Sequence, residues 1–217
     1  MTGARRPEAV AAACAAGGAP VDMVDVILGL DAPALPEGFE PHLYQALARL
    51  VPWIAAEPCA GIHPLRGVRG PDGSLLLAKR TKLVVRMPRD KICAASVLEG
   101  TSLDVAGVRL RLGQGTYRRL APASTLYAVR VVTGDGDEAS FLARVGGEME
   151  QLAVRGELLC GRRSDLTREG RQVAAWSLAV HELSGDDSLV LQRRGLGLMR
   201  DIGCGIFAPH KTIHTAD

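Results

Sequence analysis

The order of predicted strands and helices repeats in the two halves of the chain, and this repeat restricts the fold more than any other feature. Residues 21–30 begin with alternating apolar and acidic side chains, which is typical of a half-buried strand. Residues 41–55 place leucines at helical spacing, with Pro41 in a position that suits a first turn. For the rest of this half, the same criteria predict strands at 75–77 and 82–87 and a helix at 88–98. They also predict a strand at 103–112 that is broken by a turn at Ala106-Gly107.

The second half repeats the order strand, helix, strand, strand, helix, strand. Its apolar periodicity and turn residues predict these elements at 126–132, 137–154, 157–160, 173–180, 186–192 and 206–208. Ser184 and the acidic residues after it suit the start of the last helix, because they satisfy free amide groups and the helix dipole. The order β-α-β-β-α-β is that of the ferredoxin-like fold. RNA-recognition motifs also use it, but this chain lacks their R-G-F-x-F signature for base stacking.

We therefore predict an α+β protein of two tandem ferredoxin-like, RRM-like (βαββαβ) domains. The chain of 217 residues is long enough for two such domains of about 100 residues each. The predicted boundaries are an N-terminal extension at 1–20, a first domain at 21–112, a linker at 113–124 and a second domain at 125–217. The alanine-rich extension faintly resembles a secretory signal, but Glu8 interrupts it, so we interpret it as a floppy or short helical segment.

Composition narrows the class of protein. Hydrophobic residues make up 47% of the chain and charged residues 23%, which is typical of a globular protein and excludes disorder as the main state. The sequence contains no apolar run of about 18 residues, so we expect no membrane-spanning helix. The five cysteines are scattered without a C-x-x-C pair, which argues against a disulfide framework and a zinc site and favours a reduced cytoplasm.

The formal net charge of +2 conceals three basic clusters. Only four of the 26 basic residues are lysine, and arginine suits bidentate contacts with phosphate. A GC-rich genome also explains an excess of arginine, and a cluster of charges can equally be a solvated surface with salt bridges. The clusters comprise Lys79, Arg80, Lys82, Arg86, Arg89 and Lys91; Arg155, Arg162, Arg163, Arg168 and Arg171; and Arg193, Arg194, Arg200 and Lys211.

A glycine-rich segment, R-R-G-L-G-L-M-R-D-I-G-C-G at 193–205, is the strongest local signal. Its glycines follow a predicted helix, whereas a dinucleotide-binding fingerprint needs them between a strand and the start of a helix, so a Rossmann fold is excluded. Two explanations remain open. The glycines either let backbone amides approach a phosphate or a neighbouring chain, or they end the helix and form a tight turn.

His63 is the histidine best placed for chemistry. It lies in G-I-H-P-L-R-G at 61–67, where glycine and proline restrict the backbone and Arg66 supplies a charge. An imidazole can act as a general acid or base near neutral pH, although a single loop histidine is often structural or merely exposed. The five histidines lack metal-ligand spacing with carboxylates or cysteines, so we predict no metal site.

Four passages resemble one family. They are L-Y-Q-A-L-A-R-L-V-P-W at 43–53, G-I-H-P-L-R-G at 61–67, S-L-V-L-Q-R-R-G-L-G at 188–197 and G-C-G-I-F-A-P-H-K at 203–211. Together with the two ferredoxin-like halves, they resemble the CRISPR-associated endoribonucleases that cut precursor guide RNA within its repeats, the Cas-six family, and in particular its myxan-type branch. The resemblance covers about residues 21–213, and the last passage with its preceding glycines is the most specific.

The resemblance implies a metal-independent endoribonuclease without a cofactor. Members of the family bind the stem-loop of a CRISPR repeat and cleave at its 3′ base, where the 2′-hydroxyl attacks the adjacent phosphate. The products carry a 2′,3′-cyclic phosphate and a 5′-hydroxyl. The resemblance also implies that the protein stays bound to the processed guide RNA as a subunit of an effector complex, with other CRISPR-associated (Cas) subunits as partners and no membrane.

The resemblance also assigns roles to residues. His63 matches the motif histidine and is implied as general base or general acid, with Arg66 and Lys79 or Arg80 as sources of positive charge. Tyr44 is implied to orient the 2′-hydroxyl or the scissile phosphate. The implied RNA-binding residues are Lys79, Arg80, Arg162, Arg163, Arg168, Arg171, Arg194, Gly195, Gly197, Arg200, Gly203, Gly205, His210 and Lys211.

One departure from the family leaves alternatives open. Many members carry an Asp-His pair shortly before the Leu-Tyr of the first helix, whereas this chain has Gly38-Phe39 there and His42 next to Leu43-Tyr44. His42 is therefore a further catalytic candidate. Without the other histidine, the chain can be a catalytically weak or inactive subunit that binds the 3′ hairpin of the guide RNA. A ferredoxin-like protein that binds a small ligand or regulates an enzyme is an alternative from another class.

Overall fold

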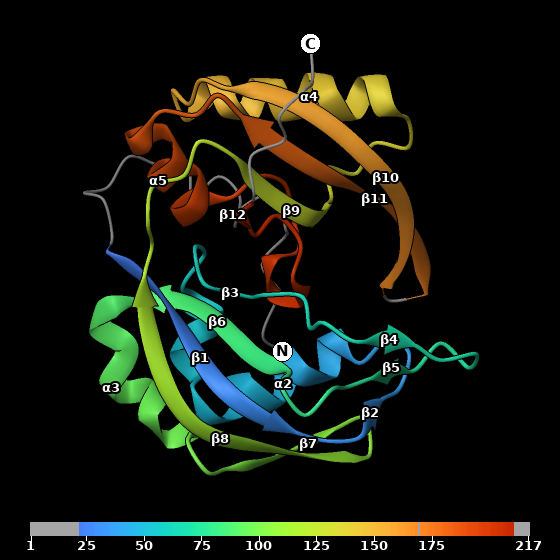
Figure 1. Cartoon of the computed structure of the whole chain (residues 1–217). Helices are drawn as coiled ribbons and strands as arrows, with labels where there is room; N and C mark the ends of the chain where they lie inside the picture. The colour runs from blue at the N-terminus through green and yellow to red at the C-terminus, as the bar shows by residue number, and fades with distance from the viewer. Residues whose placement is uncertain (1–21, 169, 211–217) are drawn as a thin grey trace, which may run out of the picture. The chain divides into compact units, whose positions relative to one another are not determined.

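The computed structural model describes residues 22–168 and 170–210 (Figure 1). Within the described residues the backbone forms two compact units. Of the described residues, the N-terminal unit contains 22–119 together with Asp201–Gly203, and the C-terminal unit contains those of Leu120–Arg200 and of 204–210. The segment 1–20, predicted as an extension, lies outside the described residues.

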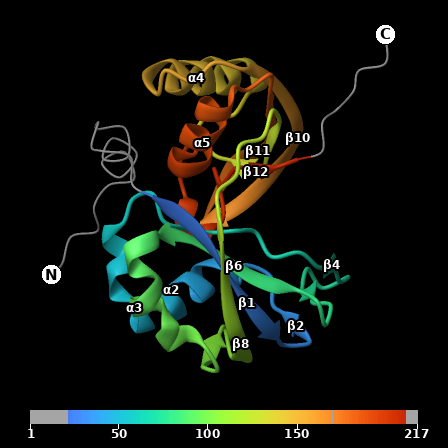
Figure 2. The same cartoon turned by 60° about the vertical axis from the view of Figure 1, so that its left-hand side comes forward.

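The N-terminal unit is built on an antiparallel sheet with the strand order β3-β6-β1-β8-β7. Its long strands are β1 (Met23–Asp31), β6 (Lys82–Pro88) and β8 (Val108–Arg119), and β1 lies between the other two (Figure 2). The short strand β3 (Gly61–Ile62) pairs with β6. If β1, β3, β6 and β8 are numbered 1 to 4 along the chain, their order in the sheet is 2-3-1-4. This is the order of a ferredoxin-like domain.

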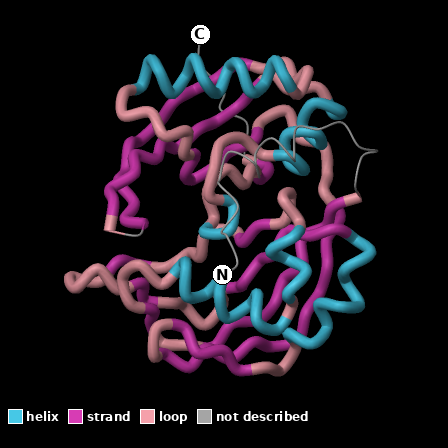
Figure 3. The backbone as a smooth tube through the Cα atoms, turned by 180° about the vertical axis from the view of Figure 1, so that it is seen from behind, coloured by secondary structure: helices cyan, strands magenta, loops and turns pink. Residues whose placement is uncertain are grey.

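Helix α2 (Glu40–Leu50) and the short helix α3 (Ile92–Ala95) cover one face of this sheet (Figure 3). Strand residues alternate between the two faces. Val24 and Val26 of β1 therefore point toward the helices, where they belong to one hydrophobic cluster with Leu47 of α2. The side chains on the opposite face of β1 point away from the helices.

Helix α2 is shorter than the helix predicted at 41–55, because it ends at Leu50. Pro52 has no amide hydrogen and restricts the residue before it, and Val51 has a non-helical φ of −126°. The helix predicted at 88–98 is also interrupted. Its three parts are Arg89–Lys91 and Ser96–Leu98, both 3-10 turns, and α3 between them.

The second strand of the sheet lies elsewhere than predicted. It is β3, in the segment that the sequence indicated as a loop. The residues predicted as that strand, 75–77, instead contribute β5 (Leu75–Leu76) to a separate three-stranded sheet. Two residues are too few to show alternation, whereas three consecutive leucines resemble a buried strand. The small sheet also contains β2 (Ala34–Leu35) and β4 (Val68–Arg69).

The strand predicted at 103–112 is a hairpin of β7 (Ser102–Val105) and the first part of β8. Ala106 and Gly107 between them have φ values of 51° and 81°, as a type I′ turn requires. The second part of β8 pairs with β1, so residues 113–119 of the predicted linker belong to the sheet. Glycine is unfavourable in strands, so the glycines of this part made the strand hard to predict.

The C-terminal unit has a second antiparallel sheet, with the strand order β10-β11-β9-β12. This is again the ferredoxin-like order, so the prediction of two tandem ferredoxin-like domains is confirmed. Figure 1 shows β10 and β11 as a long, curved hairpin. The strands are β9 (Leu126–Val131), β10 (Glu157–Arg168), β11 (Arg171–His181) and β12 (Ala208–Pro209).

Helices α4 (Glu138–Gln151) and α5 (Gly185–Arg194) contribute buried residues to the core of this unit. Each begins after a side chain that accepts an amide N–H of the first turn, Asp137 for α4 and Ser184 for α5. The predicted cap at Ser184 is therefore confirmed. None of the helices in the described part of the chain has the length and apolar composition needed to span a bilayer. The buried residues of α4 are Phe141, Val145 and Met149, whose spacing of four residues is the apolar periodicity from which this helix was predicted.

Strands β10 and β11 are longer than predicted. The sequence pattern indicated strands at 157–160 and 173–180 around an arginine-rich turn, but the pairing continues to Arg168 and Arg171, with one bulge after Cys160. Polar side chains on both faces conceal the alternation in this part. The arginines of the second cluster therefore lie on strands instead of a turn. The last strand is also shifted, from the predicted 206–208 to Ala208–Pro209.

Candidate functional site

A row of charged residues crosses the sheet of the N-terminal unit. Asp25 on β1 lies opposite Arg86 on β6 and, on its other side, opposite Arg118 on β8. The sequence neighbours Val24 and Val85 belong to the hydrophobic cluster that includes α2. Because strand residues alternate, the charged side chains lie on the face of the sheet opposite the helices.

The carboxylate of Asp25 is the centre of this row. Arg86 donates from Nε to Oδ1 at 2.8 Å and from Nη2 to Oδ2 at 3.1 Å, in a bidentate arrangement. Arg118 donates from Nη2 to Oδ2 at 3.3 Å, and Nε2 of His63 lies 3.2 Å from Oδ1. Each oxygen of the carboxylate therefore has two partners.

The network reaches from the interior of the protein to its surface. The side chains of Arg86 and Asp25 are 0% and 3% exposed, whereas that of Arg118 is 63% exposed. Burial raises the pKa of Asp25, but the hydrogen bonds and charges of His63 and Arg86 lower it more, so this pKa lies well below its usual range. The carboxylate is thus ionised and acts only as an acceptor of hydrogen bonds.

His63 follows the edge strand β3. Its amide N–H donates to the carbonyl of Val84 at 2.9 Å, so its backbone continues alongside β6. The side chain is 15% exposed and lines a small recess of the N-terminal unit. The other residues around this recess are Phe39, Glu40, Leu43, Pro64, Leu65, Ile62, Asp201 and Ile202.

Two further catalytic candidates lie on α2. His42 is exposed to solvent. Tyr44 is half-buried and packs against the hydrophobic cluster of the N-terminal unit. Phe39, directly before the helix, is buried and lines the recess beside His63. The position directly before the first helix thus places an apolar ring at the recess, next to Glu40 of the helix itself.

The candidates for charge stabilisation, Arg66, Lys79 and Arg80, are exposed and come together in the fold. Thr81 connects their two segments. Its hydroxyl donates to the carbonyl of Arg66 at 3.2 Å and accepts the amide N–H of Ala78 at 3.1 Å. The structure therefore brings the backbone of Arg66 beside the turn that contains Lys79 and Arg80.

Sequence reasoning missed Asp25 and Arg118, and it treated Arg86 only as a member of a basic cluster. A signal for Asp25 exists, because an ionised side chain inside a strand of buried residues needs a partner. The identity of the partner is not visible in the sequence. Arg86 and Arg118 are 61 and 93 residues away from Asp25 along the chain.

Three glycines of the glycine-rich segment, all in the C-terminal unit, are tied to that unit through their amide N–H groups. Gly195 ends α5 with a φ of 68°, and its amide N–H donates back into that helix. The amide of Gly197 donates to Oε2 of Glu148 at 2.6 Å, and the amide of Gly205 donates to the carbonyl of Arg130 at 2.7 Å. These three N–H groups are engaged within the protein, so the structure favours the helix end and tight turn over a phosphate contact.

The space beside these glycines is filled by the chain itself. A Cβ at Gly195 would collide with the guanidinium of Arg200, and one at Gly205 would collide with the carbonyl of Leu196. Arg200 is buried, and its Nη1 donates to the carbonyls of Arg194 and Gly205, at 3.0 Å each. The structure thus gives Gly195, Gly205 and Arg200 a role inside the loop, and their contact with RNA stays a prediction.

Gly197 and Gly203 are confined in the same way, each within its own unit. A Cβ at Gly197 would collide with the carbonyl of Val132, and one at Gly203 would lie 3.0 Å from the carbonyl of Ile62. Both glycines have positive φ values, 73° and 86°, which favour glycine over other residues. The positive φ values and the nearby carbonyls therefore explain why glycine stands at these two positions.

We expect Gly205→Ala to lower the free energy of unfolding by about 2–4 kcal/mol. The residue has a φ of 65°, and its new Cβ would meet a backbone carbonyl, which cannot move independently. Urea denaturation measures the change. Gly136→Ala is the matched control, because a Cβ there meets nothing within 4 Å, and it should stay within about 0.5 kcal/mol of the unmodified protein. Equal stability of the two variants would contradict this account of the loop.

The arginines of the β10–β11 hairpin do not share one face. Counting along β10 places Arg163 on one face and Arg168 on the other, where Arg168 pairs with Arg171 at the tip of the hairpin. Arg162 lies in the bulge. Arg163 forms an ion pair with Asp165 at 3.1 Å. The single arginine cluster of the sequence is therefore divided between two faces, with one pair at the tip.

Comparison with known families shows what kind of protein carries this site. The family model Cas6, described as Cas6 Crispr, matches residues 24–212. The chain belongs to the Cas6 family. This is the Cas-six family that its motifs resemble, so the recognition from the sequence is confirmed. The Cas6 chain is also 33% identical over 188 residues to the CRISPR-associated endonuclease Cas6 of Myxococcus xanthus, which covers 86% of this chain and 81% of that protein.

Solved structures of low sequence identity share the fold of this Cas6 chain. A structure from the characterization of a Cas6-related gene of Pyrococcus furiosus has a TM-score of 0.62 at 14% identity, covering 89% of this chain and all of that one. Thermus thermophilus Cse3, bound to an RNA that represents a pre-cleavage complex, has a TM-score of 0.52 at 16% identity, covering 86% and 98% of the two chains.

The last two RNA-binding candidates are His210 and Lys211. His210 is exposed, and its ring centroid lies 5.3 Å from that of Tyr127 on β9. Its amide N–H donates to the carbonyl of Thr125, which holds the chain beside the sheet. Lys211 lies outside the described residues. His210 thus presents a polar ring at the edge of the C-terminal sheet.

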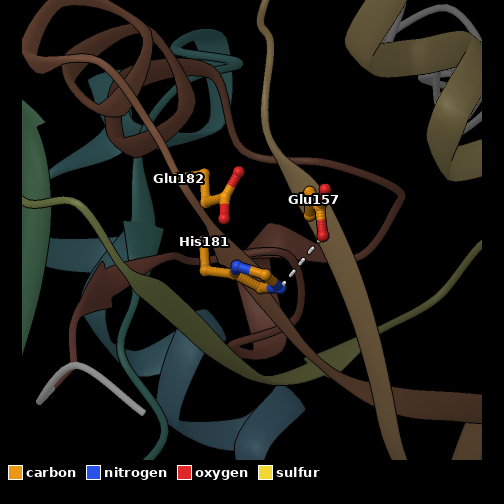
Figure 4. Close-up of side chains that lie close together, drawn as sticks. All are labelled: Glu157, His181 and Glu182. Carbon is orange, nitrogen blue, oxygen red and sulfur yellow. Dashed lines mark ion pairs between the residues drawn. The ribbon is translucent and has the colours of Figure 1, made fainter. Parts of the chain in front are cut away.

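The C-terminal unit of the Cas6 chain also contains a group of metal-ligand type. Ligand atoms of Glu157, His181 and Glu182 lie within 4.8 Å of one another (Figure 4). Glu157 and His181 are opposite each other on β10 and β11, with Oε2 and Nε2 3.8 Å apart. The search for ligand spacing missed the group because its residues come from two strands. An exposed ion pair explains the arrangement without a metal ion.

Proposed function

We propose that this Cas6 chain is an endoribonuclease that binds the stem-loop of a CRISPR repeat and cleaves precursor guide RNA without a metal ion. It then stays bound to its product as a subunit of the effector complex. The observation that carries the proposal is the geometry of His63, a motif histidine held 3.2 Å from a buried carboxylate that also binds two arginines. The name of the Myxococcus xanthus relative, an endonuclease, supports the same class of activity.

The proposed reaction requires two proton transfers and positive charge. The 2′-oxygen before the cut attacks the adjacent phosphorus, and the bond from phosphorus to the 5′-oxygen breaks. The 2′-hydroxyl must lose a proton, and the leaving 5′-oxygen must gain one. His63 is the group for proton transfer, and the exposed guanidinium of Arg118 or that of Arg66 meets the charge that develops on phosphate. Tyr44 remains the candidate for orienting the 2′-hydroxyl or the scissile phosphate, and His42 remains a further catalytic candidate.

A cleavage assay tests this proposal. Purified protein is mixed with the repeat RNA encoded beside its gene, in excess EDTA. We expect one cut at the 3′ base of the stem and a product that ends in a 2′,3′-cyclic phosphate. A single 2′-deoxy nucleotide before the cut should block the reaction, because the nucleophile is missing. Loss of cleavage in EDTA, or a cut that tolerates the 2′-deoxy nucleotide, would contradict the proposal.

We expect the double variant Arg168→Gln/Arg171→Gln to weaken binding of the repeat RNA. The two arginines face each other at the tip of the hairpin, where both can reach one phosphate backbone. Each lost phosphate contact reduces the slope of log affinity against log salt by about one, so the slope should fall by about two. Filter binding at several salt concentrations measures it.

The control for this variant is Arg49→Gln/Arg109→Gln. It removes the same charge from exposed positions on α2 and β8, outside the hairpin. If both double variants lower the slope equally, the effect is a general loss of charge and the hairpin has no special role. An unchanged slope in Arg168→Gln/Arg171→Gln would remove the tip from the RNA interface.

A second candidate function is a subunit that holds the 3′ hairpin of the guide RNA with weak or no cleavage. Phe39 favours it, because many family members carry a histidine there, and in this structure its buried ring lines the recess beside His63. The same assay separates the two functions. RNA that is retained at moderate salt and never cut supports the second candidate, and failure to retain RNA favours a protein that binds a small ligand.

A further inference from the structure

The sequence motif of His63 assigns no role to Asp25, but the structure places Asp25 in the proposed site. Its Oδ1 faces His63 and its Oδ2 faces Arg118, so one carboxylate contacts both the proton-transfer group and an exposed cation. Arg86 binds both oxygens and is fully buried, so it holds the plane of the carboxylate and cannot itself touch RNA. The carboxylate of Asp25 is therefore a buried anion of fixed orientation that contacts both His63 and Arg118.

The chemistry of this contact decides which nitrogen of His63 carries hydrogen. An ionised carboxylate only accepts hydrogen bonds, so Nε2 of His63, 3.2 Å from Oδ1, must be the donor. A neutral imidazole has hydrogen on one nitrogen alone. With that hydrogen on Nε2, the basic atom of the ring is Nδ1.

We propose that Asp25 is a positioning residue for RNA cleavage: it holds Nε2–H of His63 and thereby presents Nδ1 as the base. This inference rests on the proposed ribonuclease function. In the step, Nδ1 takes the 2′-hydroxyl proton while the 2′-oxygen bonds to phosphorus and the bond to the 5′-oxygen breaks. The 5′-oxygen takes a proton from a solvent water, and the imidazolium returns its proton to the hydroxide that remains.

The charges around the ring support this role. The carboxylate of Asp25 stabilises the imidazolium that forms in the step, because opposite charges attract at this distance. Arg86 and Arg118 oppose part of that effect. Glu40 of α2 and Asp201, which line the same recess as His63, add to it. On the outer side, the exposed Arg118 is held by the carboxylate where a phosphate can approach.

NMR of the unmodified protein tests the tautomer without any assay of activity. In ¹⁵N-labelled protein, two-bond couplings from the ring hydrogens distinguish hydrogen on Nδ1 from hydrogen on Nε2, and the spectrum of His63→Ala identifies the signal of His63. We expect the neutral ring of His63 to carry its hydrogen on Nε2. A neutral ring with its hydrogen on Nδ1 would overturn the proposal.

Asp25→Asn provides the second test. The new amide has one acceptor and one donor group. With its oxygen in the place of Oδ2, where it accepts from Nη2 of both Arg86 and Arg118, its NH₂ group faces His63 and favours the other tautomer. We expect single-turnover cleavage to fall by about 10²-fold, while the Kd for repeat RNA changes by less than about threefold. The NMR signal should move to the form with hydrogen on Nδ1. A purely structural role of Asp25 would lower the melting temperature without this change of tautomer.

Asp22→Asn is the matched control, because Asp22 forms an exposed ion pair with Arg89 at 3.3 Å, just before the same strand. Its cleavage rate should stay within about twofold of the unmodified protein. If the unmodified protein does not cut repeat RNA, the proposed function fails. If it cuts and Asp25→Asn cuts equally fast, only the role of Asp25 fails. If Asp25→Asn does not fold, the tautomer in the unmodified protein decides.

Discussion

His63→Ala is expected to reduce single-turnover cleavage of the repeat RNA by about 10²–10⁴-fold, while RNA affinity stays within about threefold. The change removes the proton-transfer group of the proposed site and leaves the pair of Arg86 and Asp25 in place. The rate is measured in EDTA with protein in excess over RNA. Affinity is measured separately, with RNA that carries a 2′-deoxy nucleotide at the cut.

His181→Ala is the control for this prediction. That histidine also lies beside a carboxylate, Glu157 at 3.8 Å, but it belongs to the C-terminal unit, away from the motif of His63. Its rate should equal that of the unmodified protein. Undiminished cleavage by His63→Ala would remove His63 from the mechanism. A parallel loss of rate and RNA affinity would instead indicate that His63 binds RNA.

Arg86→Met is expected to lower the free energy of unfolding by about 3–5 kcal/mol. The carboxylate of Asp25 would lose both bonds from Arg86 and keep its charge, while its side chain is only 3% exposed to solvent. Removing one partner costs more than the pair contributes, because the remaining charge is poorly solvated. Urea denaturation at neutral pH measures the loss. Arg89→Met breaks an exposed pair with Asp22 and should cost less than about 1 kcal/mol, so equal losses would contradict the argument.

The contribution of the Asp25 carboxylate to the free energy of unfolding depends on pH. The pKa of Asp25 is lower in the folded protein than in the unfolded chain, so the unfolded chain takes up the proton first as pH falls. The stabilisation by this carboxylate is complete above the ordinary aspartate pKa of about 3.9 and is lost progressively below it. Arg86→Met raises the folded pKa, so its stability should fall less steeply below about pH 4 than that of the unmodified protein. Parallel curves would contradict the assignment.

Signals between near neighbours allowed the fold to be predicted. The cap at Ser184 and the buried face of α4 depend on residues within a few positions, and both follow from the sequence. The order of such elements was sufficient for the fold class. The ends of elements were wrong where glycine or proline changes the local preference, as in α2, which stops before Pro52, and in β8, which continues through Gly113 and Gly115.

The site was predictable only in its local part. His63 stands in a short motif and could be found, but its partner Asp25 is 38 residues away, and the pairing of β1, β3, β6 and β8 brings the network together. The glycines illustrate the same limit. Their need for positive φ is local, whereas the atoms that fill the space beside them come from Arg200 and the carbonyl of Leu196. Spacing alone therefore could not separate a packed loop from a phosphate contact.

A short segment near the end of the described chain belongs to the N-terminal unit, although most of the C-terminal unit precedes it in the sequence. Asp201–Gly203 belong to the N-terminal unit, where Asp201 and Ile202 line the recess of His63 and Gly203 fits against Ile62. No single cut of the backbone can therefore yield both ferredoxin-like units as complete pieces. A recombination crossover near residue 120 would transfer His63 without one wall of its recess. Inheritance of the histidine is thereby coupled to inheritance of the distant glycine-rich segment.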